Sequence, residues 1–416
     1  MSDKISPCDC DSISQKLISV EQAYSQLLAA ATPLQAQESI PIMQALGRVI
    51  ATPCQSTVDV PPADNSAMDG YAFNTADVQD GETCLPISQR ICAGDTGQPL
   101  AAGTAARIFT GASIPPEANA VIMQELVEVR DNKACFSGPQ PAGQSIRRAG
   151  EDIAHGDDIL TPGKRLRGQE MGLAASIGLS QLQVYRRLKV GVFFTGDELI
   201  EPGQPLPPGK IYDSNRYTLH GLLQAMGCEI IDLGIVEDTL AATRIALQSA
   251  AEQADLVITS GGVSVGEEDH VRIALESLGQ LSLWRIAMKP GKPLAFGQVD
   301  NTPFIGLPGN PVSVFATFHL FAAPFIKKMQ GMSQYRPQAT PVLANFTTNK
   351  PAKRQEYLRA RLSHTDQGQC QAETFPHQGS GVLTSTSWGD GFIVIPVGKT
   401  IQTGDTVDYL PFNDLL

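Results

Sequence analysis

The chain of 416 residues is 42% hydrophobic and 18% charged, a composition that supplies apolar material for packed cores and excludes wholesale disorder. Its formal net charge of -12, from 43 acidic and 31 basic side chains, argues against a general electrostatic grip on nucleic acid or anionic lipid. No stretch of about 18 apolar residues and no secretory leader pattern is present. We therefore expect a globular, cytoplasmic protein of several domains, without nucleic-acid or membrane partners.

The eight cysteines show no CxxC pair and no zinc-finger spacing, so we expect most of them to be reduced thiols. Cys8 and Cys10 stand close together in a polar terminus, but two ligands alone are a weak basis for a metal site. No histidine pair forms HExxH and no serine lies in GxSxG, so zinc hydrolysis and α/β-hydrolase chemistry have no support. His220 and His270 are expected to be structural.

The first part of the chain separates into a linking domain and a β-rich domain. Residues 17–31 place apolar side chains at helical spacing after a polar, unpatterned start. Residues 58–150 consist of short β-prone runs broken by Gly, Pro and Asp, which indicates a separate β-rich domain. Residues 151–185 return to a mixed pattern with a helical centre. We therefore expect a discontinuous linking domain, residues 16–57 plus 151–185, around the β-rich domain.

From residue 186 apolar strands alternate with helices, which predicts a parallel α/β sheet with crossover helices in a domain of residues 186–336. The expected strands are 188–195, 228–236 and 254–262, and the expected helices are 214–226, 239–253 and 311–330. Open α/β sheets bind ligands at the carboxyl ends of their strands, so we expect the site there. Residues 337–416 return to short β-like segments and are expected to form a final small β domain.

The segment TSGGVSVGEEDHV (259–271) follows an apolar strand and precedes an expected helix. Its glycines could bring backbone N–H groups close to an anion, so phosphate binding is one hypothesis. A tight strand-to-helix turn is the alternative, and the glycine pair alone favours it. Glu267, Glu268 and Asp269 strengthen the first hypothesis, because carboxylates beside a phosphate suit a bound magnesium ion.

Two further loops could bind anions. The segment MKPGKPLAFG (288–297) holds Lys289 and Lys292 in a stiff proline turn, which suits an oxyanion, although a lone KPGK would favour a solvated β-turn. The segment IGLPGNPVSVFATF (305–318) runs from strand to helix, with Pro311 at the expected first helical position. Free N–H groups at that helix start would attract negative charge, and the shaping of the turn alone is the alternative.

Two acidic loops are candidates for recognition or metal binding. The segment FFTGDEL (193–199) sets Asp197 and Glu198 at the end of a strand, where a carboxylate can hold a metal or accept N–H groups of a ligand. Capping of a helix is the alternative for Asp197. A capped turn is also the alternative for the loop PPADNSAMDGYAF (61–73), whose density of polar groups suits recognition through Asp64, Asn65, Ser66 and Asp69.

In their order and spacing these segments resemble one family, the molybdopterin molybdotransferases, which include bacterial MoeA and the E domain of gephyrin. The resemblance covers nearly the whole chain. The segments that carry it are DNSAMDGYA (64–72), IFTGASIPPEANAVIMQE (108–125), RRAGEDI (147–153), TGDEL (195–199), YDSN (212–215), TSGGVSVGEEDHV, MKPGKPLAFG and GLPGNPVS (306–313). Each is weak alone, but in this order they are highly specific.

The resemblance implies an elongated homodimer whose subunits combine a parallel α/β domain of molybdopterin-binding type with a β-rich domain, a helical and extended linking domain and a C-terminal β-barrel-like domain. It implies a cleft between the α/β domain of one subunit and the β-rich domain of the other. The implied reaction inserts molybdate into adenylylated molybdopterin and releases AMP, assisted by Mg²⁺ or a similar divalent cation. A molybdopterin adenylyltransferase and molybdoenzyme apoproteins or chaperones are compatible further partners.

The same resemblance implies roles for individual residues. Catalytic roles are implied for Asp69, Thr110, Asp152, Glu198, Asp238, Asp269 and Lys289, with the first three approaching from the partner subunit. The implied metal ligands are Asp197, Glu198 and Asp269. Substrate contacts are implied for Gly261, Gly262, Ser264, Gly266, Arg285, Lys292, Pro308, Pro311, Ser313, Arg359 and Ser380. Arg285 stands where relatives often carry lysine, which keeps the charge but alters the donor geometry.

Other functions stay open at the level of sequence. The α/β domain also suits the adenylyltransferase that prepares the substrate, although the extra β-rich domains argue against it. A gephyrin-like scaffold for receptor peptides is the alternative outside the enzymes, but this chain lacks the long linker and the second catalytic domain of that protein. A nucleotide hydrolase that shares the α/β domain is a weaker alternative.

Overall fold

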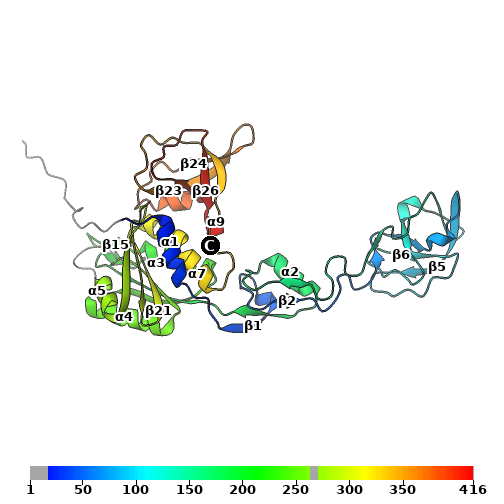
Figure 1. Cartoon of the computed structure of the whole chain (residues 1–416), viewed down its shortest axis with the longest axis horizontal. Helices are drawn as coiled ribbons and strands as arrows, with labels where there is room; N and C mark the ends of the chain where they lie inside the picture. Colours follow the sequence, from blue (N-terminus) through cyan, green and yellow to red (C-terminus); the bar gives the residue numbers. More distant parts are fainter. Residues whose placement is uncertain (1–16, 263–269, 416) are drawn as a thin grey trace, which may run out of the picture.

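The computed structural model describes residues 17–262 and 270–415, which form an elongated molecule (Figure 1). A helix-covered sheet and a β-barrel lie together at one end, and a second β-rich unit lies at the other. A narrow arm of paired strands with one helix connects the two ends. Within the described ranges, no helix has the length and apolar character needed to span a bilayer.

The α/β unit is built on a six-stranded sheet in the order β16-β13-β17-β21-β20-β18. Its first four strands pair in parallel, as the alternation of strands and helices predicts. β20 runs antiparallel to both of its neighbours, β18 and β21, and a tight turn at residues 300–301 joins it to β21. The sheet is therefore mixed. Its strands are β13 (Lys189–Thr195), β16 (Glu229–Val236), β17 (Leu256–Ser260), β18 (Gly279–Arg285), β20 (Pro293–Val299) and β21 (Thr302–Leu307).

The helices begin where the sequence places caps. Asp213 accepts a hydrogen bond from the N–H of Arg216, and Thr239 accepts one from Ala242, so the predicted helices 214–226 and 239–253 are confirmed. The predicted helix 311–330 is also present, but its middle turn widens to a π-helix. The helices of this end are α1 (Val20–Ala30), α3 (Ser214–Ala225), α4 (Leu240–Gln253), α5 (His270–Leu278), α6 (Pro311–Thr317), η4 (Phe318–Ala322) and α7 (Ala323–Met329).

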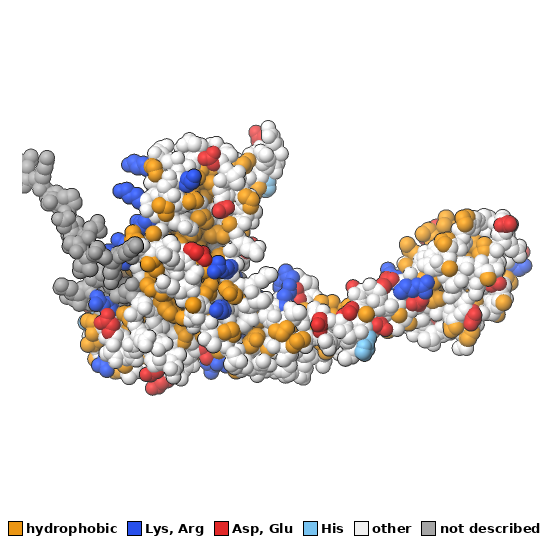
Figure 2. Space-filling view, in the orientation of Figure 1, with side chains coloured by type: hydrophobic (Ala, Val, Ile, Leu, Met, Phe, Trp, Pro, Cys, Tyr) orange, Lys and Arg blue, Asp and Glu red, His pale blue; other side chains and the backbone are white. Residues whose placement is uncertain are grey.

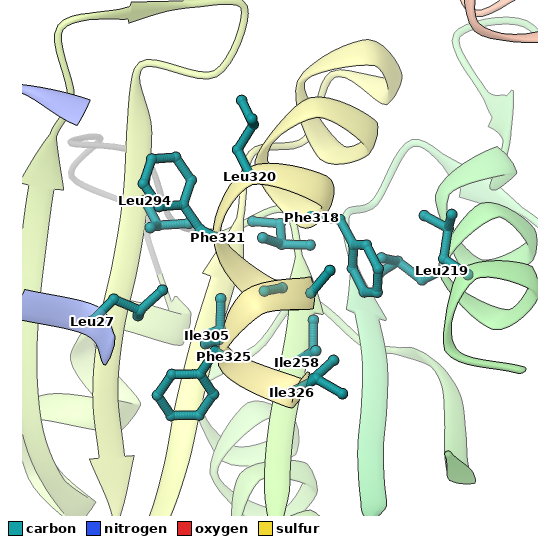
Figure 3. Packing of buried hydrophobic residues seen from close by; sticks show 14 of the residues in the cluster. Leu27, Leu219, Ile258, Leu294, Ile305, Phe318, Leu320, Phe321, Phe325 and Ile326 are labelled. Atoms are coloured by element: carbon teal, nitrogen blue, oxygen red, sulfur yellow. The ribbon is translucent and has the colours of Figure 1, made fainter. Parts of the chain in front are cut away.

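Helices cover both faces of this sheet, so its central strands are buried on both sides. On one face, the long helix α6–η4–α7 packs with α1 and α3. Figure 3 shows Phe321 and Phe325 of this helix against the strands that carry Leu294 and Ile305. On the other face, Phe193 packs with residues of α4 and α5. Neighbouring residues of β13 thus enter different cores, since successive side chains of a strand point to opposite faces.

The last part of the chain forms a closed five-stranded barrel, because β23 pairs with both β24 and β25. This confirms the predicted small β domain. The two-residue strand β19 (Met288–Lys289) leaves the α/β unit and adds to β23 in parallel, which joins the two units. The barrel elements are β22 (Thr340–Ala344), β23 (Gln355–His364), β24 (Cys370–Thr374), β25 (Gly391–Ile395), β26 (Thr406–Pro411), α8 (Thr384–Trp388) and α9 (Phe412–Leu415).

The far unit is a six-stranded sheet in the order β7-β4-β6-β5-β9-β8, as expected for a β-rich segment. A disulfide bond joins Cys84 on β5 to Cys135 on β9, a pair that cysteine spacing did not predict. The other cysteines that the structure describes are free, in line with the expected reduced thiols. The strands are β4 (Gly70–Phe73), β5 (Glu82–Ile91), β6 (Ala105–Ile108), β7 (Ala120–Met123), β8 (Glu128–Arg130) and β9 (Lys133–Ser137).

The arm is made from two segments that run in opposite directions. Strands from residues 37–66 pair antiparallel with strands from residues 146–185. The first segment leads to the far unit, and the second leads back from it beside the first. The three pairs are β1 (Gln37–Pro41) with β12 (Gln181–Tyr185), β2 (Cys54–Gln55) with β11 (Asp158–Leu160), and β3 (Asn65–Ser66) with β10 (Ile146–Arg147). The arm helix is α2 (Gly168–Ser176).

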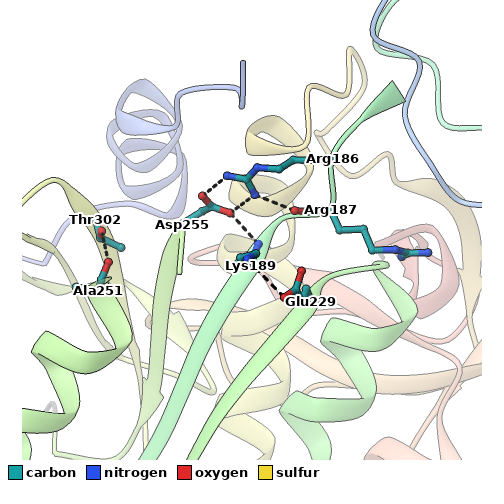
Figure 4. Close-up of polar contacts among 7 residues, drawn as sticks. All are labelled: Arg186, Arg187, Lys189, Glu229, Ala251, Asp255 and Thr302. Carbon is teal, nitrogen blue, oxygen red and sulfur yellow. Dashed lines mark hydrogen bonds and ion pairs between the residues drawn. The ribbon is translucent and has the colours of Figure 1, made fainter. Parts of the chain in front are cut away.

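A charged cluster fixes the point where the arm enters the sheet (Figure 4). Arg186 donates two hydrogen bonds to the carboxylate of Asp255, at 2.7 and 2.6 Å, and the N–H of Lys189 donates a third at 2.8 Å. Burial raises the pKa of the Asp255 carboxyl, but the bonds from Arg186 and Lys189 outweigh it and the pKa is lowered. The carboxylate thereby ties the start of β13 to the start of β17.

An aromatic cluster joins the long helix to the barrel. His319 lies between the rings of Phe315, at 4.2 Å, and Phe412, at 5.6 Å, and Phe392 of β25 completes the cluster. His319 Nδ1 donates to the carbonyl of Phe315 at 2.8 Å, whereas the buried Nε2 has no partner among the described residues. Burial lowers the pKa of His319 to about 4, so the ring is neutral in the folded protein.

We expect the stability of this end of the molecule to fall as the pH decreases from about 6.5 to about 4. In that window His319 binds a proton in the unfolded chain but not in the folded one, so protons favour unfolding. His319→Phe should remove about 1–3 kcal/mol of this pH dependence. Urea unfolding of both proteins across the window measures it, and equal pH slopes in the two proteins would contradict the prediction.

Candidate functional site

A cleft of about 610 Å³ lies where the carboxyl ends of the parallel strands face the barrel. The sequence predicts a site at this edge, and the loops after β13, β17 and β21 do form one wall. The described residues that line the cleft are Thr195, Gly196, Glu198, Asp238, Gly261, Gly262, Lys289, Pro290, Gly291, Lys292, Pro293, Pro308, Gly309, Asn310, Ser313, Arg354, Gln378, Gly379 and Ser380.

The acidic side of the cleft carries Glu198 and Asp238. Asp238 accepts a hydrogen bond from the hydroxyl of Thr195 at 2.9 Å, which orients its carboxylate at the end of β13. Asp197 does not line the cleft, and its backbone carbonyl accepts a hydrogen bond from the ammonium of Lys210. It precedes the short strand β14 (Leu199–Ile200), which pairs with β15 (Ile211–Tyr212), and not a helix, so the capping hypothesis for Asp197 is wrong.

The loop after β17 needs glycine at two positions. Gly261 has a φ of +95°, and a Cβ there would lie 3.0 Å from the carbonyl oxygen of Thr195. A Cβ on Gly262 would lie 2.6 Å from the side chain of Val271. The glycine pair therefore makes a close strand-to-helix turn and also exposes its backbone to the cleft. Other predicted residues of this loop lie outside the described residues, namely Ser264, Gly266, Glu267, Glu268 and Asp269.

The basic side of the cleft is the turn Lys289–Lys292, which contains a cis Lys289–Pro290 peptide bond. Lys289 Nζ lies 3.2 Å from a carboxylate oxygen of Glu356 on β23. Lys292 forms no ion pair with any residue that the structure describes, so its charge is available to a ligand. Gly291 packs so closely on the long helix that a Cβ would lie 2.5 Å from the methyl group of Thr317. The turn is therefore held in place, as its prolines predict.

Three hydrogen bonds align the loops at the start of α6. Asn215 donates to the carbonyl of Gly309 at 2.8 Å and to the hydroxyl of Ser260 at 3.0 Å, which ties the loops after β17 and β21 together. The N–H of Val312 donates to the carbonyl of Ser380 at 2.9 Å. Pro311 occupies the first turn of the helix, as predicted, but does not line the cleft.

Arg359 supports the cleft from behind. It is fully buried and does not line the cleft, but donates to the hydroxyl of Ser385 at 2.9 Å and to the carbonyl of Gly379 at 3.2 Å. Its own N–H donates to the side chain of Gln378 at 3.0 Å. Burial lowers the pKa of Arg359 to about 10, so it stays cationic at neutral pH. The structure thus makes it the support of the loop that carries Ser380.

The predicted residues of the β-rich side lie far from this cleft. Asp69 accepts two hydrogen bonds from Thr110, both at 2.8 Å, and these bonds lower the pKa of its carboxyl. Both residues belong to the unit at the opposite end of the molecule (Figure 1). Asp152 lies on the return segment beside Val60. Arg285 ends β18 and also does not line the cleft. One chain alone does not bring these groups together.

Three family models match: the MoeA N-terminal region (domain I and II) at residues 18–178, a probable molybdopterin binding domain at 191–328, and the MoeA C-terminal region (domain IV) at 342–412. A molybdopterin molybdenumtransferase of Haemophilus influenzae is 41% identical over 96% of this chain and 100% of its own. The chain belongs to the MoeA family.

Other members of the MoeA family agree with this assignment. A molybdopterin molybdenumtransferase of Nostoc is 36% identical over 89% of this chain and 87% of its own length. The crystal structure of a molybdopterin biosynthesis MoeA protein of Pyrococcus horikoshii has a TM-score of 0.83 and 29% identity, covering 95% of this chain and 100% of its own. The MoeA arrangement of units therefore extends over the whole molecule.

Sequence analysis missed several residues of this MoeA-family cleft. Arg354 lies just before β23, in a segment without a motif, and reaches the cleft only because β23 pairs with β19. Thr195 belongs to the segment FFTGDEL (193–199), but the spacing of residues in the sequence does not reveal its hydrogen bond to Asp238. The apolar face of β13, with Thr195 at its polar end, was the one available signal.

We expect Arg359→Lys to loosen the loop of Gln378, Gly379 and Ser380, because an ammonium cannot reproduce the divergent guanidinium bonds. The variant should lose about 1–3 kcal/mol of stability and raise the KM for the anionic substrate more than it lowers kcat. Thermal unfolding and steady-state kinetics measure the two effects. An unchanged KM would show that the loop is held without Arg359.

Proposed function

We propose that this chain is a molybdopterin molybdenumtransferase, which inserts molybdate into adenylylated molybdopterin and releases AMP. The observation that carries the proposal is the cleft itself, in which the cationic turn of Lys289 and Lys292 faces the carboxylates of Glu198 and Asp238. Relatives matched along their full length bear the name molybdopterin molybdenumtransferase. Its volume of about 610 Å³ is typical of a small-molecule site, and its lysines suit a ligand with several anionic groups.

The two sides of the cleft have different tasks in this reaction. Lys289 and Lys292 attract the tetraoxo dianion and hold it beside the dithiolene sulfurs of the pterin, where fixed charges need no rearrangement. The hydroxyls of Ser313 and Ser380 donate to its oxygens. The glycine backbone of residues 261–262 approaches the phosphates of the adenylyl group. Attack of water on the phosphoanhydride breaks its P–O bond and releases AMP and the pterin phosphate. The two dithiol sulfurs then bind molybdenum in place of one oxo group, which leaves as water with the two thiol protons, so the oxidation state of molybdenum does not change.

The acidic side fits a divalent cation such as Mg²⁺. Magnesium is commonly held by one or two carboxylates together with substrate phosphates, and Glu198 and Asp238 supply two carboxylates at the strand ends. The described residues contain no cluster of three or more metal-binding side chains, so the phosphates would complete the set. When bound, the ion would polarise the phosphoanhydride and neutralise its charge. By resemblance, Asp269 would also contribute, but it lies outside the described residues, whereas Asp197 does not line the cleft.

We extend the proposal to a homodimer in the cytoplasm. Asp69, Thr110 and Asp152 can reach a cleft only in a second copy of the chain, because the arm carries them to the opposite end of the molecule. The bonds from Thr110 keep the Asp69 carboxyl ionised and oriented, ready to approach a ligand from outside. A compatible donor of the pterin is a molybdopterin adenylyltransferase, and compatible acceptors are molybdoenzyme apoproteins or chaperones.

The alternative functions receive less support. An adenylyltransferase would need only the α/β unit, whereas this chain matches its relatives over all its units. A peptide-binding scaffold would not need the lysine turn of residues 289–292 to face the carboxylates of Glu198 and Asp238 across a cleft. Neither alternative accounts for the contribution of the barrel loop of Ser380 to the same cleft.

Lys292→Ala and Asp238→Asn should each lower the rate of AMP release and molybdenum insertion by about 100-fold or more, because each removes a fixed charge that faces the reacting groups. Purified protein, adenylylated molybdopterin and molybdate are mixed, and AMP is quantified by chromatography. Insertion is scored by reconstitution of an apo-molybdoenzyme.

Lys133→Ala is the matched control for these variants, because Lys133 is an exposed lysine on β9 of the far unit. This control should retain wild-type activity. Near-native activity of Lys292→Ala or Asp238→Asn, with an intact fold by circular dichroism, would refute the assigned roles. Consumption of ATP with metal-free molybdopterin would instead favour the adenylyltransferase.

A mixture of two inactive variants tests the composite site. Co-expression of Lys292→Ala with Asp69→Asn should restore about a quarter of wild-type activity, since half of the dimers are mixed and each mixed dimer has one intact cleft. Each variant expressed alone should be much less active. Activity of the mixture no higher than that of the single variants would contradict the shared cleft.

A further inference from the structure

A second hollow of about 600 Å³ lies beside the cleft, on the barrel side. Its charged lining residues are Lys289, Lys350, Lys353, Arg354 and Glu356. Four of these five are cations, and the single carboxylate already pairs with Lys289 at 3.2 Å. The segment that supplies most of them, residues 348–356, lies between the first and second strands of the barrel and was not singled out by its sequence.

The positive charge of this hollow is unneutralised. Within the described ranges, Lys350, Lys353 and Arg354 form no ion pair or side-chain hydrogen bond. Figure 2 shows lysine and arginine side chains along one edge of the barrel. The whole chain carries a net charge of -12, so its general field repels anions. A local cationic hollow is what a small dianion needs in order to approach such a protein.

The backbone of the segment is fixed on both sides, which keeps the points of attachment of its cations around one hollow. Thr348 exchanges two hydrogen bonds with Ile401, at 2.8 and 2.9 Å, and Ala352 does the same with residues 398–399, at 2.7 and 3.2 Å. The N–H of Gln355 donates to the carbonyl of Ala287 in the α/β unit at 2.9 Å. Holding like charges together is costly without a ligand, which favours a role in anion binding over a structural one.

The hollow shares two lining residues with the cleft. Lys289 and Arg354 line both spaces, because the pairing of β19 with β23 sets these two side chains at their boundary. An anion in the hollow thus contacts side chains that also face the cleft. Glu356, which engages Lys289 at this boundary, competes with any anion for that ammonium group.

We propose that this hollow collects a tetrahedral oxyanion from solvent and delivers it to the cleft along Lys289 and Arg354. The inference rests on the proposed function, which makes molybdate the free dianion that the protein must take up. The phosphate group of a nucleotide has the same shape and charge, so the experiment compares the two. The step is binding and transfer only, and no bond is made or broken in the hollow.

The full chain is tested with Lys350→Glu and Lys353→Glu, and with Lys133→Glu as the control of equal charge change. Equilibrium dialysis with molybdate and, in a separate arm, with AMP measures affinity at low ionic strength. Lys350→Glu and Lys353→Glu should each raise the KM for molybdate by about three- to tenfold with kcat unchanged. The Kd for molybdate from dialysis should rise by the same factor. The AMP arm and the control should stay at wild-type values.

Glu356→Gln should change the affinity for molybdate in the opposite direction, and a loss of folding could not produce such an increase. Removal of the competing carboxylate should tighten molybdate binding by about two- to fivefold. Unchanged molybdate affinity in the hollow variants, an effect on AMP instead of molybdate, or weaker binding in Glu356→Gln would each overturn the inference. Wild-type protein without insertion activity would refute the proposed function, whereas dialysis tests the hollow independently of turnover.

Discussion

The cleft exists because the barrel is held against the α/β unit in one position. The contacts of this joint include the pairing of β19 with β23, the bond from Val312 to the carbonyl of Ser380, and the aromatic cluster around His319. The strand pairing aligns the two units, and the aromatic rings of the cluster pack across the joint. If the barrel moved, the loop of Ser380 would leave the lysine turn, and neither wall would be complete.

The joint also organises charge. Acidic groups stand at the ends of the parallel strands, whereas the cations come from the turn after β18 and from the start of β23. An acidic protein that must hold anions therefore concentrates its positive potential at one boundary between units. Arg359 contributes in a different way. It is buried, and among the described residues it has no carboxylate partner and donates only to neutral oxygens, so that it shapes a loop and does not line the cleft.

The arm imposes a geometric limit on function. Its antiparallel pairs are held along their length, and they separate the Asp69–Thr110 pair from the cleft of the same chain. A site that uses both ends has to be shared between copies, which is the physical basis of the proposed dimer. The cluster of Arg186 and Asp255 serves the same geometry, because it anchors the arm where β13 begins.

The sequence by itself determined the local elements and the chemistry of the loops. The alternation of apolar strands with helices predicted α3 and α4, and the order of motifs indicated the MoeA family and a cleft at the strand ends. Only the tertiary structure decided that Arg354 enters the cleft, that Arg359 lies behind it, and that Cys84 pairs with Cys135. These outcomes depend on pairing between segments distant in the chain, such as β19 with β23 and β5 with β9. Local periodicity fixes which face of a strand is buried, but it contains no information about which distant strand lies beside it.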